Sequence, residues 1–183
     1  KLAMVIPITL LIVILLLYIN TKSWIKTGIV LLALPFSLIG AFWFLYLAGF
    51  NMSVAVWVGI IALLGVDAET GVIMLLYLDI SYEKFKKKGI LNSFADLREA
   101  IFEGAVKRIR PKMMTVMTTM LGLLPIILGT GIGSDVMKRI AAPMVGGIIT
   151  SFLMELTVYP AIFYLLKRRE LRKELGNNMI QEA

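Results

Sequence analysis

The chain has 183 residues, of which 59% are hydrophobic and 17% are charged, and it contains neither Cys nor His. Soluble domains hold about 45–50% apolar and about 25% charged residues, so this composition excludes an ordinary water-soluble domain. The missing residue types also exclude thiolate chemistry, imidazole acid–base chemistry and zinc sites built from Cys and His. A net charge of +7 can attract nucleic acid, but its placement along the chain indicates another use. We therefore expect an integral membrane protein.

Five apolar stretches follow one another along the chain, each close to the roughly 20 residues that a helix needs to cross a bilayer. Because lipid offers the backbone no hydrogen-bonding partner, such continuous runs must be helices. We predict an all-α membrane protein with a bundle of transmembrane helices at about residues 2–20, 28–50, 54–78, 112–129 and 140–166. These helices form a transmembrane domain over residues 1–167, and residues 168–183 are predicted to be a cytoplasmic tail.

One more helix, amphipathic and cytoplasmic, is predicted at about residues 93–109. Its apolar side chains recur at spacings of three and four, and Asn92 or Ser93 can cap its N-terminus. Its basic end and apolar face favour a position on the membrane surface. Pro111 then suits the first turn of the next transmembrane helix, where the N–H that proline lacks has no helical partner.

Lys and Arg residues are distributed unevenly between the connections. Two lie between the first and second apolar stretches, nine between the third and fourth, and five in the tail, which places 16 of the 19 on one side. Since the cation-rich side of a membrane protein faces the cytoplasm, we expect an external N-terminus, a cytoplasmic C-terminus and no nucleic-acid partner. The chain begins without Met, and an odd number of helices with an external N-terminus needs an upstream segment. We therefore expect the carboxy-terminal part of a larger membrane protein.

Ionisable residues within the apolar stretches are candidates for function, because each costs about 2.5–3.5 kcal/mol at the bilayer centre even on the lenient insertion scale. Asp67 and Glu69 lie in the middle of the third stretch. Two residues correspond to about 200° around a helix, so the two carboxyls cannot share a face. Either can be a neutral structural group, but a pair in one helix centre favours function. Glu155, in the middle of the fifth stretch, needs a cation or a hydroxyl as its partner.

Lys112 is the candidate counter-charge. The uncharged run at 113–128 has only 16 residues, so a spanning helix must include Lys112. Lys112, Thr115 and Thr119 then form a polar stripe along one face. A Lys at a helix end usually extends its amine to the headgroups. Paired with a buried Glu of a neighbouring helix, however, it can relay protons, because protonation of the carboxyl breaks the ion pair.

Eleven Met residues are the only sulfur-containing side chains. Thioethers select soft ions such as Cu(I) and bind Zn(II) poorly. Met at helical spacing is nevertheless more often a flexible filler of the core. The number of Met residues therefore does not establish a metal site.

Three blocks of the sequence, GVDAETGVIMLLYLD, RIRPKMMTVMTTMLGLLPI and GTGIGSDVMKRIAAPMVGG, resemble the heavy-metal-efflux branch of the resistance–nodulation–division exporters. The resemblance extends from Leu2 to about Lys167. It implies the second half of a twelve-helix transmembrane domain in the bacterial inner membrane, without the first half and the periplasmic domains of the same chain. It also implies a homotrimer within the lipid bilayer that works with a periplasmic adaptor and an outer-membrane channel, and a transporter rather than an enzyme.

The same resemblance implies roles for individual residues. Glu69 and Lys112 occupy the positions of the proton relay, which they would share with an Asp on the fourth helix of the first half. Asp67 is not needed for that relay, so its role stays open, and Thr115 is a further candidate beside Lys112. The block around Glu69 is more similar to copper/silver pumps than to cobalt–zinc–cadmium pumps. We therefore expect protons as the coupling ion, Cu(I) or Ag(I) as the transported substrate, no bound cofactor, and Met137 as a candidate metal ligand.

Two other functions remain open. One is an exporter of the same family for divalent metals or organic compounds, and the other is a structural membrane subunit without transport chemistry. An intramembrane aspartyl protease is excluded because it needs two Asp side chains that face each other. Asp67 is alone in its apolar stretch, and Asp135 lies in an external turn.

Overall fold

The computed structural model describes the backbone of residues 2–91 and 93–181, and the side chains of residues 8, 11–91 and 93–172. Over this part of the chain the secondary structure consists of α1 (Leu2–Thr21), α2 (Trp24–Leu47), α3 (Val54–Lys87), α4 (Phe94–Leu128) and α5 (Ser134–Gln181). Helices α2 to α5 are each long and apolar enough to cross a membrane. Helix α1 has 20 residues, and its part Leu11–Thr21, where the side chains are described, is apolar as well. The predicted all-α membrane fold is confirmed.

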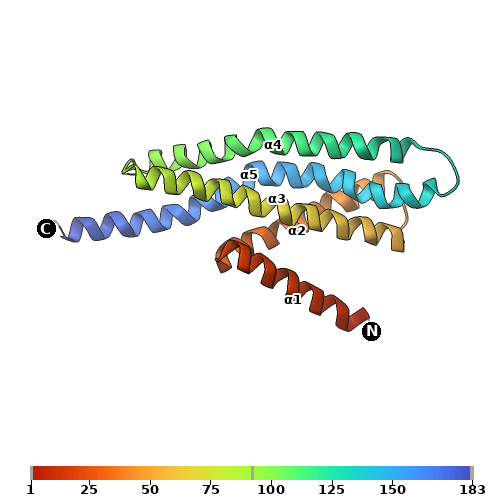
Figure 1. The fold of residues 1–183 in the computed structure, drawn as a ribbon, viewed down its shortest axis with the longest axis horizontal. Helices are drawn as coiled ribbons and strands as arrows, with labels where there is room; N and C mark the ends of the chain where they lie inside the picture. Colours follow the sequence, from red (N-terminus) through yellow and green to blue (C-terminus); the bar gives the residue numbers. More distant parts are fainter. Residues whose placement is uncertain (1, 92, 182–183) are drawn as a thin grey trace.

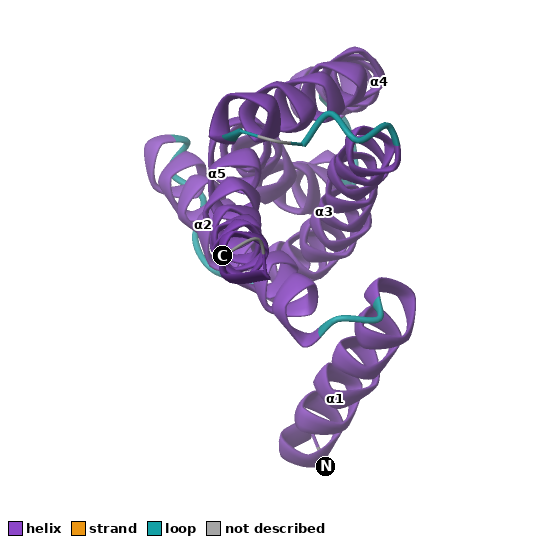
Figure 2. Cartoon of the chain, turned by 90° about the vertical axis from the view of Figure 1, so that its left-hand side faces the viewer, coloured by secondary structure: helices purple, strands orange, loops and turns teal. Residues whose placement is uncertain are grey.

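Helix α5 is at the centre of the bundle, because it packs against α2, α3 and α4. Figure 1 shows α3, α4 and α5 running side by side along the longest axis, and the end-on view in Figure 2 shows α2, α3 and α4 arranged around α5. Helix α1 diverges from the bundle in both views. It contacts α2 and α3 and buries Leu17 near its C-terminal end, while most of its described apolar side chains are exposed.

Glycines allow α5 to approach its neighbours closely. A Cβ at Gly40 of α2 would lie 2.6 Å from the backbone oxygen of Gly146 in α5, and a Cβ at Gly146 would lie 2.4 Å from that of Gly40. On the other side of α5, a Cβ at Gly147 would lie 2.1 Å from a methyl carbon of Leu63 in α3. Small residues permit such contacts between membrane helices, where packing rather than water exclusion drives association. The close contacts of α5 bring its polar side chains near those of α3.

The first half of α4 is where the fold differs most from the sequence prediction. The helix predicted at 93–109 continues through Pro111 into the apolar run, so one helix of 35 residues replaces two. Of the two predicted caps, Ser93 accepts a hydrogen bond from the Ala95 N–H at 3.2 Å, and Asn92 lies outside the described residues. This half packs against its neighbours and buries Leu97, Ala100, Ile101, Gly104, Ala105 and Arg108. That packing offsets the roughly 3 kcal/mol that a Pro costs inside a helix. The prediction of a separate surface helix, with Pro111 in the first turn of the next helix, is wrong.

Other helix ends differ from the predicted spans because apolar runs mark the lipid-facing length rather than the end of the helix. Helix α3 continues beyond residue 78 to Lys87 and stops before Gly89, whose φ of +68° disfavours other residues. Helix α2 stops two residues before Gly49, whose φ is +70°. The segment predicted as a tail at 168–183 continues α5 as a helix as far as Gln181. Residues 182 and 183 of that segment lie outside the described residues.

The two ends of the bundle differ in charge. The α3–α4 connection and the C-terminal end of α5 lie at one end, and the α2–α3 and α4–α5 connections lie at the other (Figure 1). The first end carries most of the cations, including Lys84, whose ammonium lies 2.9 Å from a Glu103 carboxylate oxygen. The helix arrangement therefore separates the charges as the sequence predicted.

Candidate functional site

A group of polar side chains is buried in the middle of the bundle where α3, α4 and α5 meet. We call it the interior cluster; it consists of Asp67 and Thr70 from α3, Lys112 from α4, and Glu155 and Tyr159 from α5. Only 3% of Asp67, 4% of Lys112 and 3% of Glu155 is exposed. Ionisable groups this deeply buried are rare in membrane interiors and are expensive to keep. The interior cluster is therefore the candidate functional site.

The centre of the interior cluster is an ion pair between α4 and α5. The Lys112 ammonium donates a hydrogen bond to Oε1 of Glu155 at 3.0 Å. The Thr70 hydroxyl lies 2.5 Å from the same oxygen and also contacts the Val66 carbonyl at 3.0 Å. One carboxylate oxygen thus joins three helices, which confirms that Glu155 has both a cation and a hydroxyl as partners.

Asp67 is the second carboxyl of the cluster. The hydroxyl-bearing residues Ser37 of α2 and Ser151 of α5 face it, and the charge of Lys112 acts on it from α4. Its Oδ2 atom has no hydrogen-bond partner in the structure, and the same holds for Oε2 of Glu155 and the hydroxyl of Tyr159. Three buried polar atoms in one region therefore keep free hydrogen-bonding capacity, which is unusual because buried polar groups are nearly always paired.

Helical periodicity explains why these residues meet. Asp67, Thr70 and Met74 are three or four residues apart and are all buried, so they lie on one face of α3. Glu155 and Tyr159 are four residues apart on α5. The Tyr159 hydroxyl reaches α3 at Gly71, where a Cβ would lie 2.4 Å from the hydroxyl oxygen. A glycine at this position makes room for the tyrosine ring.

Glu69 lies outside the interior cluster. It is exposed, because two residues of helix turn it about 200° away from Asp67. Among the described residues it takes part in none of the ion pairs, and Lys112 pairs with Glu155 in its place. The structure thus does not bring together the two residues predicted as the relay. It confirms the expectation that Asp67 and Glu69 occupy different faces.

Thr115 is exposed as well, although it was predicted to share a polar stripe with Lys112. Its hydroxyl donates to the Lys112 carbonyl of its own helix at 2.8 Å, a local bond that satisfies the hydroxyl without another helix. Thr70 and Tyr159 belong to the cluster but were not predicted. Their spacing from Asp67 and Glu155, at three and four residues, was the available signal.

Met137, the candidate metal ligand, lies at the opposite end of the bundle from the cation-rich connections. It is 55% exposed and lines a shallow pocket of about 450 Å³ together with the glycine-rich α4–α5 turn. Within the residues that the structure describes, no three His, Cys, Asp or Glu side chains gather into a metal-binding group. Met137 is thus an accessible thioether beside a turn.

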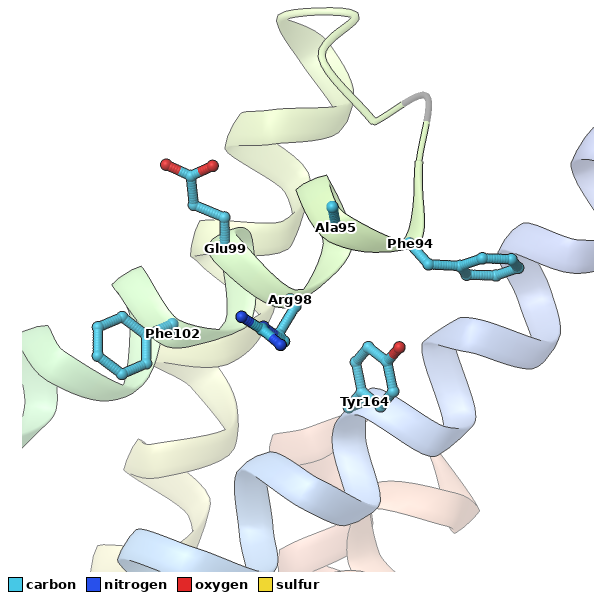
Figure 3. A pocket seen from close by; sticks show the side chains of 6 residues that line it. All are labelled: Phe94, Ala95, Arg98, Glu99, Phe102 and Tyr164. Carbon is cyan, nitrogen blue, oxygen red and sulfur yellow. The ribbon is translucent and has the colours of Figure 1, made fainter.

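A pocket lies on the surface between α4 and α5, near the cation-rich end. Its volume is about 670 Å³, and its lining residues are Phe94, Ala95, Arg98, Glu99, Phe102 and Tyr164. Figure 3 shows Arg98 between Phe102 and Tyr164, and Glu99 pointing away from Tyr164. The pocket shares no residue with the interior cluster, so the buried ion pair does not open into it.

Long apolar helices around buried ionisable groups define the class of the protein: it is a helical membrane protein with charges inside its bundle. Comparison with known proteins identifies the family. The family model described as the AcrB/AcrD/AcrF family matches residues 1–167. The chain belongs to this family.

Individual relatives confirm the predicted resemblance to heavy-metal exporters. The chain is 45% identical to the cation efflux system protein CusA of Escherichia coli K12 over 177 residues, which are 94% of this chain and 17% of CusA. It is 33% identical to the cobalt-zinc-cadmium resistance protein CzcA of Cupriavidus metallidurans over 171 residues, which are 93% of this chain and 15% of CzcA. A crystal structure of a heavy metal efflux pump superposes with a TM-score of 0.76 at 34% identity, over 91% of this chain and 15% of that one. The chain thus spans about one sixth of the length of these relatives.

Proposed function

We propose that this chain is the carboxy-terminal transmembrane part of a pump that exports Cu(I) or Ag(I) across the bacterial inner membrane in exchange for protons. The observation that carries the proposal is the set of buried ionisable residues in long apolar helices, in a chain that is similar to heavy-metal efflux proteins along nearly its whole length. Such residues inside a membrane mark ion or proton pathways.

We propose Glu69 as a proton carrier on the outer face of α3, the face that is turned away from the interior cluster. It lies in the apolar run of α3 and is exposed there beside Val66 and Gly65. A carboxyl in this position needs a polar partner from outside the described helices, since an isolated charge in lipid is costly. An Asp on the fourth helix of the first half of such a pump would provide that partner. Proton exchange between the two would then bias the packing of the halves.

Lys112 is proposed as the cation that responds to these proton movements. Its ammonium is held by Glu155, and the neighbouring Pro111 removes one backbone hydrogen bond from α4. Thr115, one turn further along, keeps its hydroxyl on the Lys112 carbonyl. Asp67 adds a second carboxyl close to the ammonium. A change in protonation next to Lys112 would therefore change the balance of charge between α3, α4 and α5.

A monovalent soft metal is the proposed cargo. The identity to CusA, 45%, is higher than the identity to the cobalt-zinc-cadmium protein, 33%, and Met137 offers a thioether at the end of the bundle away from the cation-rich connections. Thioethers suit Cu(I). The cation-rich end is proposed to face the cytoplasm, which puts Met137 on the periplasmic side. A homotrimer, a periplasmic adaptor and an outer-membrane channel are the proposed assembly partners.

The test uses the full-length pump in a bacterial host from which the native copper and silver exporters have been deleted. Glu69→Gln should reduce Ag(I) and Cu(I) tolerance to the level of the host without the pump, because a neutral amide cannot carry a proton. The amount of protein in the membrane should stay at the wild-type level, since Glu69 makes no ion pair within the described chain. Lys112→Ala should also abolish tolerance.

Glu83→Gln is the matched control, because Glu83 is also exposed on α3 but lies beyond the predicted apolar run. It should leave metal tolerance unchanged. Wild-type tolerance in both Glu69→Gln and Lys112→Ala would discard the relay and favour a structural role. Transport by the wild-type pump in vesicles, measured with Ag(I), Zn(II) and a fluorescent dye, separates a monovalent-metal pump from a divalent-metal or organic-compound pump.

A further inference from the structure

The interior cluster holds two carboxyls and one ammonium in a region closed to solvent. Asp67, Glu155 and Lys112 are each at most 4% exposed. The residues that face the two carboxyls come from four helices and are Ser37 of α2, Thr70 of α3, Lys112 of α4, and Ser151 and Tyr159 of α5. Of these, Lys112 alone carries a positive charge. With Tyr159 neutral, and with both carboxyls and the ammonium charged, the net charge of the cluster is therefore −1.

An uncompensated charge in the middle of a membrane bundle is strongly unfavourable, because burial of an ion without a partner costs several kcal/mol. The bundle can neutralise the extra charge by binding one cation, which is either a proton or a small metal ion. The ammonium of Lys112 already occupies the position beside Glu155, at 3.0 Å. A metal ion at the same place would be repelled by this ammonium.

The free hydrogen-bonding atoms of the cluster match a proton. Oδ2 of Asp67 and Oε2 of Glu155 are buried and have no partner. A proton on either atom converts the carboxylate into a neutral acid and leaves one carboxylate for Lys112. Two carboxyls in one low-dielectric site disfavour each other's ionisation, so such a site favours one neutral acid and one carboxylate.

We propose that Asp67 and Glu155 form an interior proton-binding site that takes up one proton, with Lys112 neutralising the remaining carboxylate. The proton arrives from water as hydronium and leaves to water, and no other bond forms or breaks. This site uses neither Glu69 nor the outer face of α3. It shares Lys112 with the proposed relay, so it would add a second proton-binding position to a pump that works as proposed above.

The charge count gives a first test on the full-length protein purified in lipid nanodiscs, with the thermal unfolding temperature as the measurement. Asn and Gln reproduce the neutral form of each acid. Asp67→Asn and Glu155→Gln should therefore each fold with an unfolding temperature near that of the wild type, since one carboxylate still balances Lys112. The double variant leaves Lys112 without a counter-charge and should unfold at a clearly lower temperature than the two single effects predict together.

A second test observes the proton directly. Infrared difference spectra between acidic and alkaline pH should show, in the wild type, the C=O stretch of one carboxylic acid of the interior cluster per chain. This signal should be absent from both single variants. It should persist in Glu69→Gln and in Asp79→Asn, a control on the same helix whose carboxylate pairs with Lys26 near one end of the bundle. Because Glu69→Gln abolishes the proposed relay but keeps the interior site, failure of the pump hypothesis and failure of this inference give different results.

Three outcomes would overturn the proposal. The first is a single variant that unfolds as readily as the double variant, because the charge count would then be wrong. The second is a C=O signal that survives in both Asp67→Asn and Glu155→Gln. The third is a signal that is displaced by NaCl or KCl at constant pH, which would make the bound cation a metal ion.

Discussion

The two faces of α3 each carry a carboxyl, and the two carboxyls differ in burial. Asp67 faces α5, where hydroxyls and Lys112 surround it, and it is 3% exposed. Glu69, two residues later, is exposed on the outer face among apolar side chains. Asp67 on the inner face has polar neighbours within this chain, whereas Glu69 on the outer face takes part in none of the ion pairs among the described residues. Burial therefore distinguishes a group that organises the bundle from a group available to a neighbouring segment.

Removal of Lys112, the central cation of the inner face, should have the largest effect on stability. Lys112→Ala leaves the Glu155 carboxylate buried beside Asp67 without its counter-charge, and we expect a loss of about 3–5 kcal/mol in unfolding free energy. Thr115→Ala, one turn further along on the outer side of α4, loses only a bond to its own helix and should change little. Denaturation of the purified full-length protein in detergent measures both. Equal losses would mean that the inner and outer faces of α4 do not differ.

Close packing provides the next test. Gly146→Val places side-chain atoms within 2.4 Å of the Gly40 carbonyl oxygen, and overpacking of this kind costs about 1–3 kcal/mol. Gly65 lies on the outer face of α3 with no atom within 4 Å of its would-be Cβ. Gly65→Ala should therefore be neutral or raise stability by up to about 1 kcal/mol through helix propensity. Thermal unfolding should show a lower unfolding temperature for Gly146→Val and an equal or higher one for Gly65→Ala.

A smaller effect is expected from the tyrosine of the interior cluster. The Tyr159 hydroxyl has no hydrogen-bond partner, so Tyr159→Phe removes an unpaired polar group and should change the unfolding free energy by less than about 1 kcal/mol. Tyr159→Ala, in contrast, removes a ring that is 99% buried and should cost about 3–5 kcal/mol. A large destabilisation by Tyr159→Phe would show that the hydroxyl has a partner in the membrane.

The smallest effect concerns a carboxyl at the cation-rich end, beyond the apolar runs. The hydrogen bond from Lys107, which has the larger effect, and the hydrogen bond from Lys84 lower the pKa of Glu103 from its ordinary 4.5 to about 2. Because the pKa is lower in the folded protein, the contribution to stability is present above about pH 4.5 and is lost as the pH falls towards 2. Glu103→Gln should slightly flatten the acid limb of a thermal stability profile and leave it unchanged near neutral pH. Glu99→Gln, nearby on the same helix, is the control.

Sequence reasoning found the membrane helices because apolar length and charge placement are physical requirements of the bilayer, and these act on each segment separately. It also found Asp67, Glu155 and Lys112, because each is costly in lipid wherever it points. It did not find that Lys112 pairs with Glu155, since that contact depends on how α4 and α5 are rotated against each other. The continuity of α4 across Pro111 was missed for a related reason. A proline penalty is local, whereas the packing that outweighs it comes from α3 and α5.

The unbroken course of α4 has a mechanical consequence. With 35 residues and about 1.5 Å of rise for each, the helix is a rod of roughly 50 Å that joins the cation-rich end to the glycine-rich turn beside Met137. Pro111 lacks the N–H that would bond to the Lys107 carbonyl, so one of the two proline positions of the rod adjoins its buried ammonium. A small bend there would swing the far end of α4 through a wide arc. A change in charge balance at Lys112 that bent the helix would therefore displace the end of α4 beside the glycine-rich turn.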